Sequence, residues 1–228
     1  MVTTSFAPGA FWLAGLLTLA ALPATVALPP VGLALLALAG AVVYAYRDPE
    51  RTPPPGGLVA PDDGTVSVLR WDEETDGRGD RVRLGVYLSL SDVHVVRAPA
   101  GGRVHDVRRE RGPRWPAALT RAEKNERVHV DFDGLRVTML TGAVARRIRP
   151  YADAGDRLRR GARLGHIAFG SRVDVLLPPG VGPDDLAVEP GERVRAGESV
   201  LVPPDAFGDA TDPESDSNST PEVVRPAR

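Results

Sequence analysis

The chain has 228 residues, a net charge of −2 and no cysteine. This length corresponds to one or two domains, and the small net charge provides no field that would draw the whole molecule to nucleic acid. The missing cysteine excludes disulfides, thiol nucleophiles and thiolate metal sites. Lys124 is the only lysine, so any chemistry that needs a modified lysine has one candidate.

Residues 10–46 carry no charged side chain and form two apolar runs on either side of Pro29-Pro30. Each run is near the lower length limit for crossing a bilayer. We expect a helical membrane hairpin over residues 1–47, either spanning twice or re-entrant. A hairpin buried in a protein core is the alternative, and the long uncharged stretch argues against it. The first ten residues lack the positive region of a cleaved signal peptide.

Arg47 and Arg51 follow the second apolar run directly. By the positive-inside rule, they predict that the rest of the chain lies on the cytoplasmic face of the cell membrane.

The pattern changes after a linker, rich in Pro and Gly, over residues 48–57. Residues 58–204 contain short alternating runs separated by Gly, Pro or Asp, which predict a mainly β domain. The predicted strands begin at 65-TVSVLRW, 81-RVRLGVYLSL, 103-RVHDVRR, 127-RVHVDF and 135-LRVTML. One helix is expected around residues 116–126. Residues 205–228 are polar and acidic, and predict a disordered tail.

Two patterns each occur twice in this domain. One is Ala-Pro-x-x-Gly-x-Val, at 60–66 and 98–104; the other is Gly-acid-Arg-apolar-Arg-x-Gly, at 155–161 and 191–197. They resemble the half-motifs of lipoyl/biotinyl-type folds, in which a strand of the first kind meets a strand of the second. The repeats therefore predict a barrel-sandwich with pseudo-twofold symmetry. A lipoyl-type carrier needs a lysine at the tip of a turn, and Lys124 falls in the predicted helix instead.

A Gly-Ser pair, Gly170-Ser171, interrupts the strand-like segment 165-GHIAFGSRVDVLLP-178. Glycine weakens a strand interior and is typical of a bulge or a close backbone approach. A serine hydroxyl after glycine can also attack the preceding carbonyl, because no side chain blocks it. The resulting ester can undergo β-elimination, which cleaves the chain and leaves a terminal pyruvoyl group. The pair alone does not choose between a structural bulge and this chemistry.

The surrounding segments do choose. The chain resembles the phosphatidylserine decarboxylase family, in its short archaeal-type branch, over roughly residues 46–200. The resemblance rests on five segments in the family's order: 46-YRDPERTPP-54, 60-APDDGTV-66, 89-SLSDVHVVRAPAGGRV-104, 124-KNERV-128 and 145-ARRIRPYADAGDRLRRGARLGHIAFGSRVDVLLP-178.

This resemblance implies a proenzyme that cleaves itself between Gly170 and Ser171 into a β chain, residues 1–170, and an α chain, residues 171–228. Ser171 would become the covalent pyruvoyl cofactor, in place of pyridoxal phosphate, and form a Schiff base with the substrate amine. The substrate would be phosphatidylserine or, in a haloarchaeal source, ether-linked archaetidylserine. The products would be the ethanolamine phospholipid and CO2. The partners would be the lipid bilayer and, in a homo-oligomer, further copies of the chain.

Other residues carry over by motif position. Asp63 matches the family's Asp in Pro-Ala-Asp-Gly and would help activate Ser171, directly or by orienting a base; the alternative is an ordinary turn Asp. His94 matches the first His of the longer branch's Tyr-His-x-x-His-x-Pro and would act as a general acid or base; the alternative is a structural His. Arg97 replaces the second His of that motif, which leaves the base for self-cleavage open between Asp63 and His94.

Arg97 is a candidate for binding the substrate phosphate or carboxylate, with a surface salt bridge as the alternative. Phe169 and the apolar run after Ser171 predict apolar surface beside the cleavage site. His105, His129 and His166 lack metal-ligand spacing, so no metal is expected. The Arg-rich segments 108–114 and 145–149 are expected to be solvated, and they would also attract anionic lipid near a membrane.

The sequence therefore predicts a membrane-anchored, pyruvoyl-dependent decarboxylase of serine phospholipids. A second reading is a non-enzymatic membrane-anchored adaptor built on lipoyl-like halves, as in efflux periplasmic subunits. That reading needs a long heptad hairpin between the halves, which residues 105–145 do not show. A family member that has lost self-cleavage is a third reading, and the retained Gly170-Ser171 pair argues against it.

Overall fold

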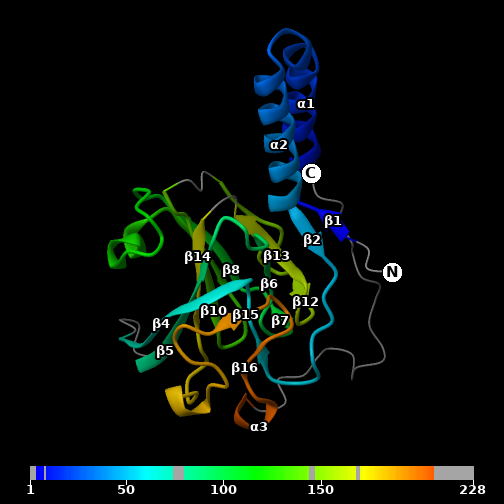
Figure 1. The fold of residues 1–228 in the computed structure, drawn as a ribbon. Coiled ribbons are helices and arrows are strands. Elements are labelled where there is room, and N and C mark those ends of the chain that lie inside the picture. Colours follow the sequence, from blue (N-terminus) through cyan, green and yellow to red (C-terminus); the bar gives the residue numbers. More distant parts are fainter. Residues whose placement is uncertain (1–3, 8, 74–79, 144–146, 168–169, 208–228) are drawn as a thin grey trace. The chain divides into compact units, whose positions relative to one another are not determined.

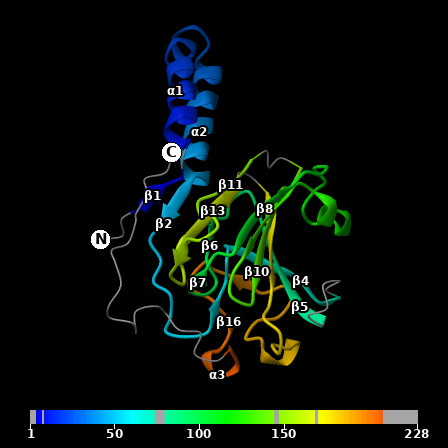
Figure 2. The same ribbon diagram turned by 180° about the vertical axis from the view of Figure 1, so that it is seen from behind.

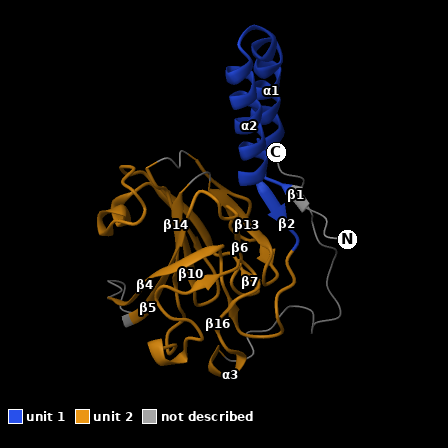
Figure 3. Cartoon of the chain, viewed as in Figure 1, with its two compact units in different colours: residues 1–50, 225–228 blue, residues 51–224 orange. Residues whose placement is uncertain are grey.

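The computed structural model describes residues 4–7, 9–73, 80–143, 147–167 and 170–207 (Figure 1). The chain divides into two units at residue 50, coloured separately in Figure 3. The N-terminal unit comes from residues 1–50, and the β-rich unit begins at Arg51.

The N-terminal unit is built on two consecutive apolar helices, α1 (Ala10–Ala27) and α2 (Pro29–Ala45). Proline at the start of α2 fits a position whose backbone N–H has no partner within the helix. Among the described residues, α1 is the helix long and apolar enough to cross a membrane, and α2 is slightly shorter. Short strands β1 (Thr4–Phe6) and β2 (Arg47–Pro49) flank the pair and are antiparallel to each other.

Large apolar side chains cover the outside of these helices. Trp12, Leu19 and Val26 are each more than two-thirds exposed within the unit. Apolar surface of this extent is favourable only against lipid or another apolar partner. The predicted helical hairpin is thus present, and its apolar surface indicates membrane association.

The β-rich unit consists of short antiparallel strands. They are β3 (Leu58–Val59), β4 (Gly64–Glu73), β5 (Asp80–Leu88), β6 (Val95–Arg97), β7 (Gly102–Arg103), β8 (Asp106–Glu110), β9 (Arg127–Asp131), β10 (Arg136–Leu140), β11 (Ile148–Pro150), β12 (Arg157–Leu158), β13 (Arg163–Ile167), β14 (Ser171–Leu176), β15 (Arg193–Val194) and β16 (Val200–Val202). The described residues of the unit also form three short helical segments: the 3-10 helices η1 (Thr120–Lys124) and η2 (Pro183–Asp185), and α3 (Pro204–Phe207).

The largest sheet has the order β15-β4-β5-β14-β10-β9-β8, so β14 lies at its centre. A second sheet, β11-β13-β6, and the pairs β12-β7 and β16-β3 complete the described strands; Figure 2 shows the second sheet from behind. Side chains alternate between the two faces of a strand. Val173 and Val175 of β14 therefore join the hydrophobic core, whereas Arg172 and Asp174 face the other way and pair with each other.

The mainly β prediction is confirmed. The described strands form separate sheets, and within them no closed barrel is present. The finer assignment, a barrel-sandwich, stays a prediction.

The two sequence repeats pair with each other in equivalent register. β12 pairs with β7 so that Leu158 faces Gly102, and β15 pairs with β4 so that Val194 faces Gly64. The flanking backbone bonds are also equivalent: the N–H of Gly161 bonds to the Ala98 carbonyl, and that of Gly197 bonds to the Ala60 carbonyl, both at 2.8 Å. The predicted meeting of one motif with the other thus occurs twice.

The helix expected around residues 116–126 is wrong in extent. Only η1, Thr120–Lys124, is helical there, and it is a 3-10 helix. The buried Asn125 explains the interruption, because its side chain bonds to both backbone groups of Trp115 and holds the segment as a closed loop. Of the predicted disordered tail, the structure describes residues 205–207 in α3; residues 208–228 lie outside the described part.

Candidate active site

Gly170 and Ser171 lie at the start of the central strand β14. Gly170 has φ +60°, a left-handed conformation that glycine adopts without steric cost. Ser171 is the first residue of β14 and is paired with Leu88 of β5. The Gly-Ser pair is therefore the entry to a strand, and a change of backbone direction sits at the bond preceding Ser171.

The Ser171 side chain is completely buried. Its Oγ has no hydrogen-bond partner within the described part of the chain. A buried hydroxyl without a partner costs about 1–3 kcal/mol, and proteins retain few of them. A role of this hydroxyl as a nucleophile would explain why it is retained without a partner.

His94, in the segment before β6, contacts the backbone of Gly170. Its Nε2 accepts the N–H of Gly170 at 3.2 Å, and its own carbonyl accepts the N–H of Ile167 at 3.1 Å. The imidazole is buried, at 5% exposure. Because Nε2 acts as an acceptor, that nitrogen carries a lone pair and is able to take a proton. The structure thus brings His94 and the Gly170-Ser171 pair together.

Gly142 closes the site from the end of β10. A Cβ atom at this position would overlap the carbonyl oxygen of Gly170, so only glycine fits against that carbonyl. The contact follows from the pairing of β10 with β14, which places Leu140 opposite Arg172. Sequence reasoning missed Gly142; its position just after a predicted strand was the only available signal.

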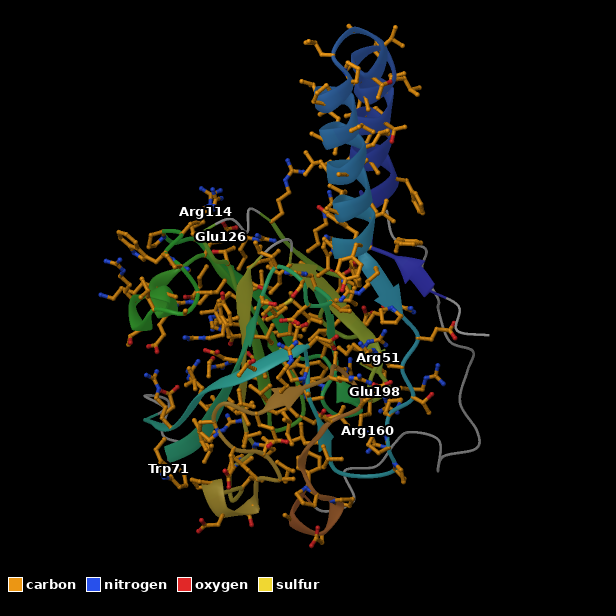
Figure 4. All side chains as sticks on the ribbon, viewed as in Figure 1. Arg51, Trp71, Arg114, Glu126, Arg160 and Glu198 are labelled. Atoms are coloured by element: carbon orange, nitrogen blue, oxygen red, sulfur yellow. The ribbon has the colours of Figure 1, made fainter. Side chains whose placement is uncertain are left out.

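Asp63 lies in a network of its own. Its carboxylate accepts a hydrogen bond from Arg51 at 2.9 Å and one from the backbone N–H of Ala196 at 2.8 Å. Arg51 also pairs with Glu198 at 2.7 Å, and both side chains are labelled in Figure 4. Within the described residues, the Asp63 carboxylate thus bonds to Arg51 and Ala196 and not to Ser171 or His94.

The neighbouring Asp62 is a residue that sequence reasoning missed. Its side chain is fully buried, and its Oδ2 has no hydrogen-bond partner within the described residues. Burial raises the pKa of Asp62 well above its usual value, and the nearby charges of Asp63 and Asp92 raise it further. The two adjacent Asp residues of 61-PDDG-64 therefore have opposite environments, one buried and one paired with arginine.

His166 is the second buried histidine near the site. Its Nδ1 shares a hydrogen bond of 2.9 Å with the hydroxyl of Tyr151. Burial lowers the pKa of His166 to about 4, and the positive charges of Arg149 and His94 add to the effect. His166 is thus held neutral at physiological pH. No role was predicted for His166 from the sequence, because a lone His within a strand carries no spacing signal.

Arg97 is buried in the fold, at 5% exposure, so it does not form a surface salt bridge. Its Nη1 donates to the carbonyl of Gly161 at 3.0 Å. Phe169, the other predicted substrate contact, lies outside the described residues. In the described ranges, no group of three or more His, Asp or Glu side chains is placed to hold a metal ion.

A buried hydroxyl follows the Gly170 carbonyl, on which Gly142 packs, and the His94 imidazole accepts the N–H of the same glycine. An arrangement of this kind suits an enzyme better than a binding adaptor. Comparisons with known proteins extend this conclusion. The family model described as phosphatidylserine decarboxylase matches residues 38–202.

Individual relatives agree. A Halobacterium salinarum protein named "Putative archaetidylserine decarboxylase proenzyme" is 49% identical, covering 76% of this chain and 86% of its own. Phosphatidylserine decarboxylase proenzymes of Thermobifida fusca and Salinibacter ruber are 42% and 40% identical, covering 73% and 80% of this chain and 75% and 82% of their own. No solved structure matches the chain significantly. The chain belongs to the phosphatidylserine decarboxylase family, a family of carboxy-lyases, and the adaptor reading finds no support.

Proposed function

We propose that this chain is the proenzyme of a pyruvoyl-dependent decarboxylase that acts on a phospholipid with a serine head group. The observation that carries the proposal is the Gly170-Ser171 bond. There, a buried hydroxyl without a partner follows a glycine at φ +60°, and His94 binds the adjacent N–H. The products would be CO2 and the ethanolamine phospholipid.

The residues present fit a cofactor derived from Ser171. Its Oγ makes no hydrogen bond, within the described residues, that cleavage would break, and the backbone of Gly142 packs against the carbonyl that Oγ would attack. A pyruvoyl group supplies an electrophilic ketone that binds an amine and accepts the electrons released when CO2 leaves. That chemistry needs neither a thiol nor a lysine, which matches a chain with no cysteine and one exposed lysine.

Self-cleavage is proposed in two steps. The Ser171 Oγ adds to the Gly170 carbonyl carbon, and the bond from that carbon to the Ser171 nitrogen breaks, which gives an ester. Loss of the Ser171 α-proton then expels the Gly170 carboxylate and divides the chain. Water converts the dehydrated residue to a ketone and releases ammonia. The β chain would be residues 1–170 and the α chain residues 171–228.

His94 is our candidate for the group that moves protons in these steps and in the decarboxylation. Its Nε2 lies at the Gly170 N–H, next to the bond that breaks. Asp63 would act indirectly, because its carboxylate is engaged by Arg51 and Ala196. It would keep the turn before Gly64 in place beside β5. Arg97 and Phe169 are our candidates for contacts with the substrate head group and its surroundings.

For the setting of the enzyme, we infer that α1 and α2 anchor it in the cell membrane with the β-rich unit on the cytoplasmic face. The arginines after α2 support this orientation. The equivalent pairing of the two repeats supports the finer architecture, a pseudo-twofold barrel-sandwich. As substrate we favour archaetidylserine, on the basis of the similarity to the Halobacterium salinarum protein.

Intact mass under denaturing conditions tests the proposal. Active membranes should yield two chains, split after Gly170, with a pyruvoyl-blocked α chain. Ser171→Ala should stay whole and inactive. Ser67→Ala is the matched control, because Ser67 also lies on a strand, where its hydroxyl donates to Gly85, and it should be cleaved normally. An active but uncleaved wild-type chain would refute the proposal.

The substrate requires a separate assay. Turnover of ester-linked phosphatidylserine and ether-linked archaetidylserine should be compared in the same mixed micelles. A clear preference for the ether lipid supports our assignment. Equal turnover, or a preference for the ester lipid, would remove it without affecting the decarboxylase itself.

A further inference from the structure

One surface of the β-rich unit combines exposed aromatic, aliphatic and cationic side chains. It is the loop of residues 111–124, which joins β8 to β9 and which we call the docking loop. Most of its side chains are exposed, and six of them carry the argument: Arg111, Arg114, Trp115, Leu119, Arg121 and Lys124.

Apolar and cationic groups are interleaved in this loop. Trp115 is 41% exposed and Leu119 is 39% exposed. The guanidinium of Arg121 lies over the Trp115 ring, 4.1 Å from its centroid. Stacked in this way, the Arg and Trp side chains present one amphipathic surface. Tryptophan favours the boundary between lipid head groups and acyl chains, and arginine on the polar side of such a surface is attracted to anionic lipid.

The charge of the loop is strongly positive. It contains four cations and one acid, Glu123, and the carboxylate of Glu123 is engaged by Arg70 of β4 at 3.0 Å. Arg114 shares Glu126 with Arg109, and Figure 4 labels Arg114 beside Glu126. Within the described part of the chain, no acidic side chain pairs with Arg111, Arg121 or Lys124.

The base of the docking loop is fixed to the candidate active site. The buried Asn125 donates to the carbonyls of Trp115 and Thr141, at 2.7 and 2.6 Å. Thr141 immediately precedes Gly142, which packs on the Gly170 carbonyl, and the buried Ala117 lies close to Gly142 as well. The tip of the loop is thus exposed, while its root touches the residues around the cleavage site.

We propose that the docking loop binds the anionic surface of a lipid bilayer, with Trp115 and Leu119 inserted at the head-group level. The partner is a bilayer because the loop offers shallow apolar insertion and unpaired cations together. This contact would be additional to the membrane anchor proposed for α1 and α2. Delivery of the lipid substrate through it rests on the proposed function; the binding itself does not.

Depth-dependent fluorescence quenching on the full chain tests the proposal. The chain has three tryptophans, at positions 12, 71 and 115. Trp12→Phe with Trp71→Phe leaves Trp115 as the reporter, and Trp12→Phe with Trp115→Phe leaves Trp71. Trp71 is the matched control, because it is 55% exposed and lies in the same unit but away from Arg114 in Figure 4.

Both proteins are reconstituted into phosphatidylcholine vesicles with and without phosphatidylglycerol, each containing a lipid with a doxyl group near the head group. We expect strong quenching of Trp115 in the anionic vesicles, with little in the neutral ones, and at least about a fivefold weaker effect at Trp71. High salt should reduce the quenching of Trp115, because it screens exposed charges.

Charge removal provides the second arm. Arg111→Gln with Lys124→Gln leaves the Arg121–Trp115 stacking intact and should abolish most of the quenching. Arg157→Gln with Arg195→Gln removes two exposed cations from other segments and should leave it unchanged. Equal quenching of Trp115 in neutral vesicles, equal quenching of Trp71, or no effect of Arg111 and Lys124 would overturn the proposal.

The readout does not depend on activity. Ser171→Ala, uncleaved and inactive if the proposed function holds, should show the same quenching as the wild type. Failure of the decarboxylase assignment would thus leave the fluorescence result intact, and failure of quenching would leave the cleavage assay intact.

Discussion

The backbone of Gly142 lies against the carbonyl oxygen of Gly170 so closely that no side chain fits between them. This contact joins the end of β10 to the entry of β14 and fixes the carbonyl that Ser171 is proposed to attack. A carbonyl whose oxygen packs against a neighbouring backbone has a defined orientation. The attack of the Ser171 hydroxyl on this carbonyl depends on that orientation.

Gly142→Ala should therefore slow self-cleavage. The added methyl group would displace the Gly170 carbonyl, and a displacement of about 1 Å costs about 100-fold in rate. The cleaved fraction should be followed with time on denaturing gels after a synthesis pulse. Gly182→Ala is the control, since a Cβ there would make only an ordinary contact with Asp185 and should not change the rate. Normal cleavage of Gly142→Ala would show that the contact is irrelevant.

Substitutions of His94 separate its hydrogen bond from its chemistry. In His94→Gln, the amide oxygen can still accept the Gly170 N–H, but it cannot take a proton at neutral pH. In His94→Ala, both are lost. If His94 moves protons, both variants should cleave about 100-fold or more slowly than the wild type. If only the bond to Gly170 matters, Gln should restore most of the rate, which would contradict our assignment.

The two adjacent Asp residues should differ in their effect on stability. Asp63→Asn weakens the pairing with Arg51 and should lower the free energy of unfolding by about 1–2 kcal/mol. Asp62→Asn should have little effect, because the amide resembles the protonated carboxyl that burial favours at this position. Urea unfolding midpoints of Ser171→Ala backgrounds, in which no cleavage intervenes, would compare them. A larger loss for Asp62→Asn than for Asp63→Asn would show that the buried carboxyl is needed in its charged form.

Stability should fall in mild acid. The pKa of His166 is about 4 in the fold, whereas an unfolded histidine titrates near 6.5. Below about pH 6.5 the unfolded chain binds the extra proton first, so stability is lost as the pH falls towards 4 and is unaffected above 7. His129, whose pKa burial also lowers to about 4, acts in the same direction. Protonation of each histidine lowers the free energy of unfolding by at most about 3 kcal/mol between pH 7 and pH 4.

His166→Gln should flatten this dependence between pH 7 and pH 4, as measured by thermal unfolding of the Ser171→Ala chain in detergent. Ser67→Ala is the control, because it removes no titratable group and should leave the slope unchanged. An unchanged slope in His166→Gln would mean that this histidine is solvated in the native protein.

Local patterns predicted most strands of the largest sheet and the helical hairpin. Alternation of apolar and polar residues is a short-range signal, and it located β4, β5, β9 and β10 to within a few residues. The repeats went further and predicted which distant segments pair. In each case the information lies within about ten residues, where side-chain period and turn residues determine the structure.

The environment of the site depends on long-range packing and was therefore harder to predict from the sequence. Gly142 meets Gly170 only because β10 and β14 are neighbours in the sheet, which no local pattern specifies. The sequence also could not tell which of Asp62 and Asp63 faces the interior, since both occupy one turn. Residues 116–126 were predicted to be helical because their composition favours a helix. The side-chain hydrogen bonds of Asn125 hold the segment in another conformation.

The position of β14 affects how the protein can refold after the chain is cleaved. β14 lies between β5 and β10, β15 pairs with β4, and β16 pairs with β3, so each described strand beyond Gly170 is held by strands that precede it. Cleavage would thus change the folded protein little and the unfolded protein greatly. The intact proenzyme regains its structure as a single chain, at a rate independent of dilution. The cut enzyme has to reassemble from two chains, so its apparent stability would depend on concentration. Maturation would therefore turn a protein that can refold alone into one that, once unfolded, regains its structure only if its two chains meet again.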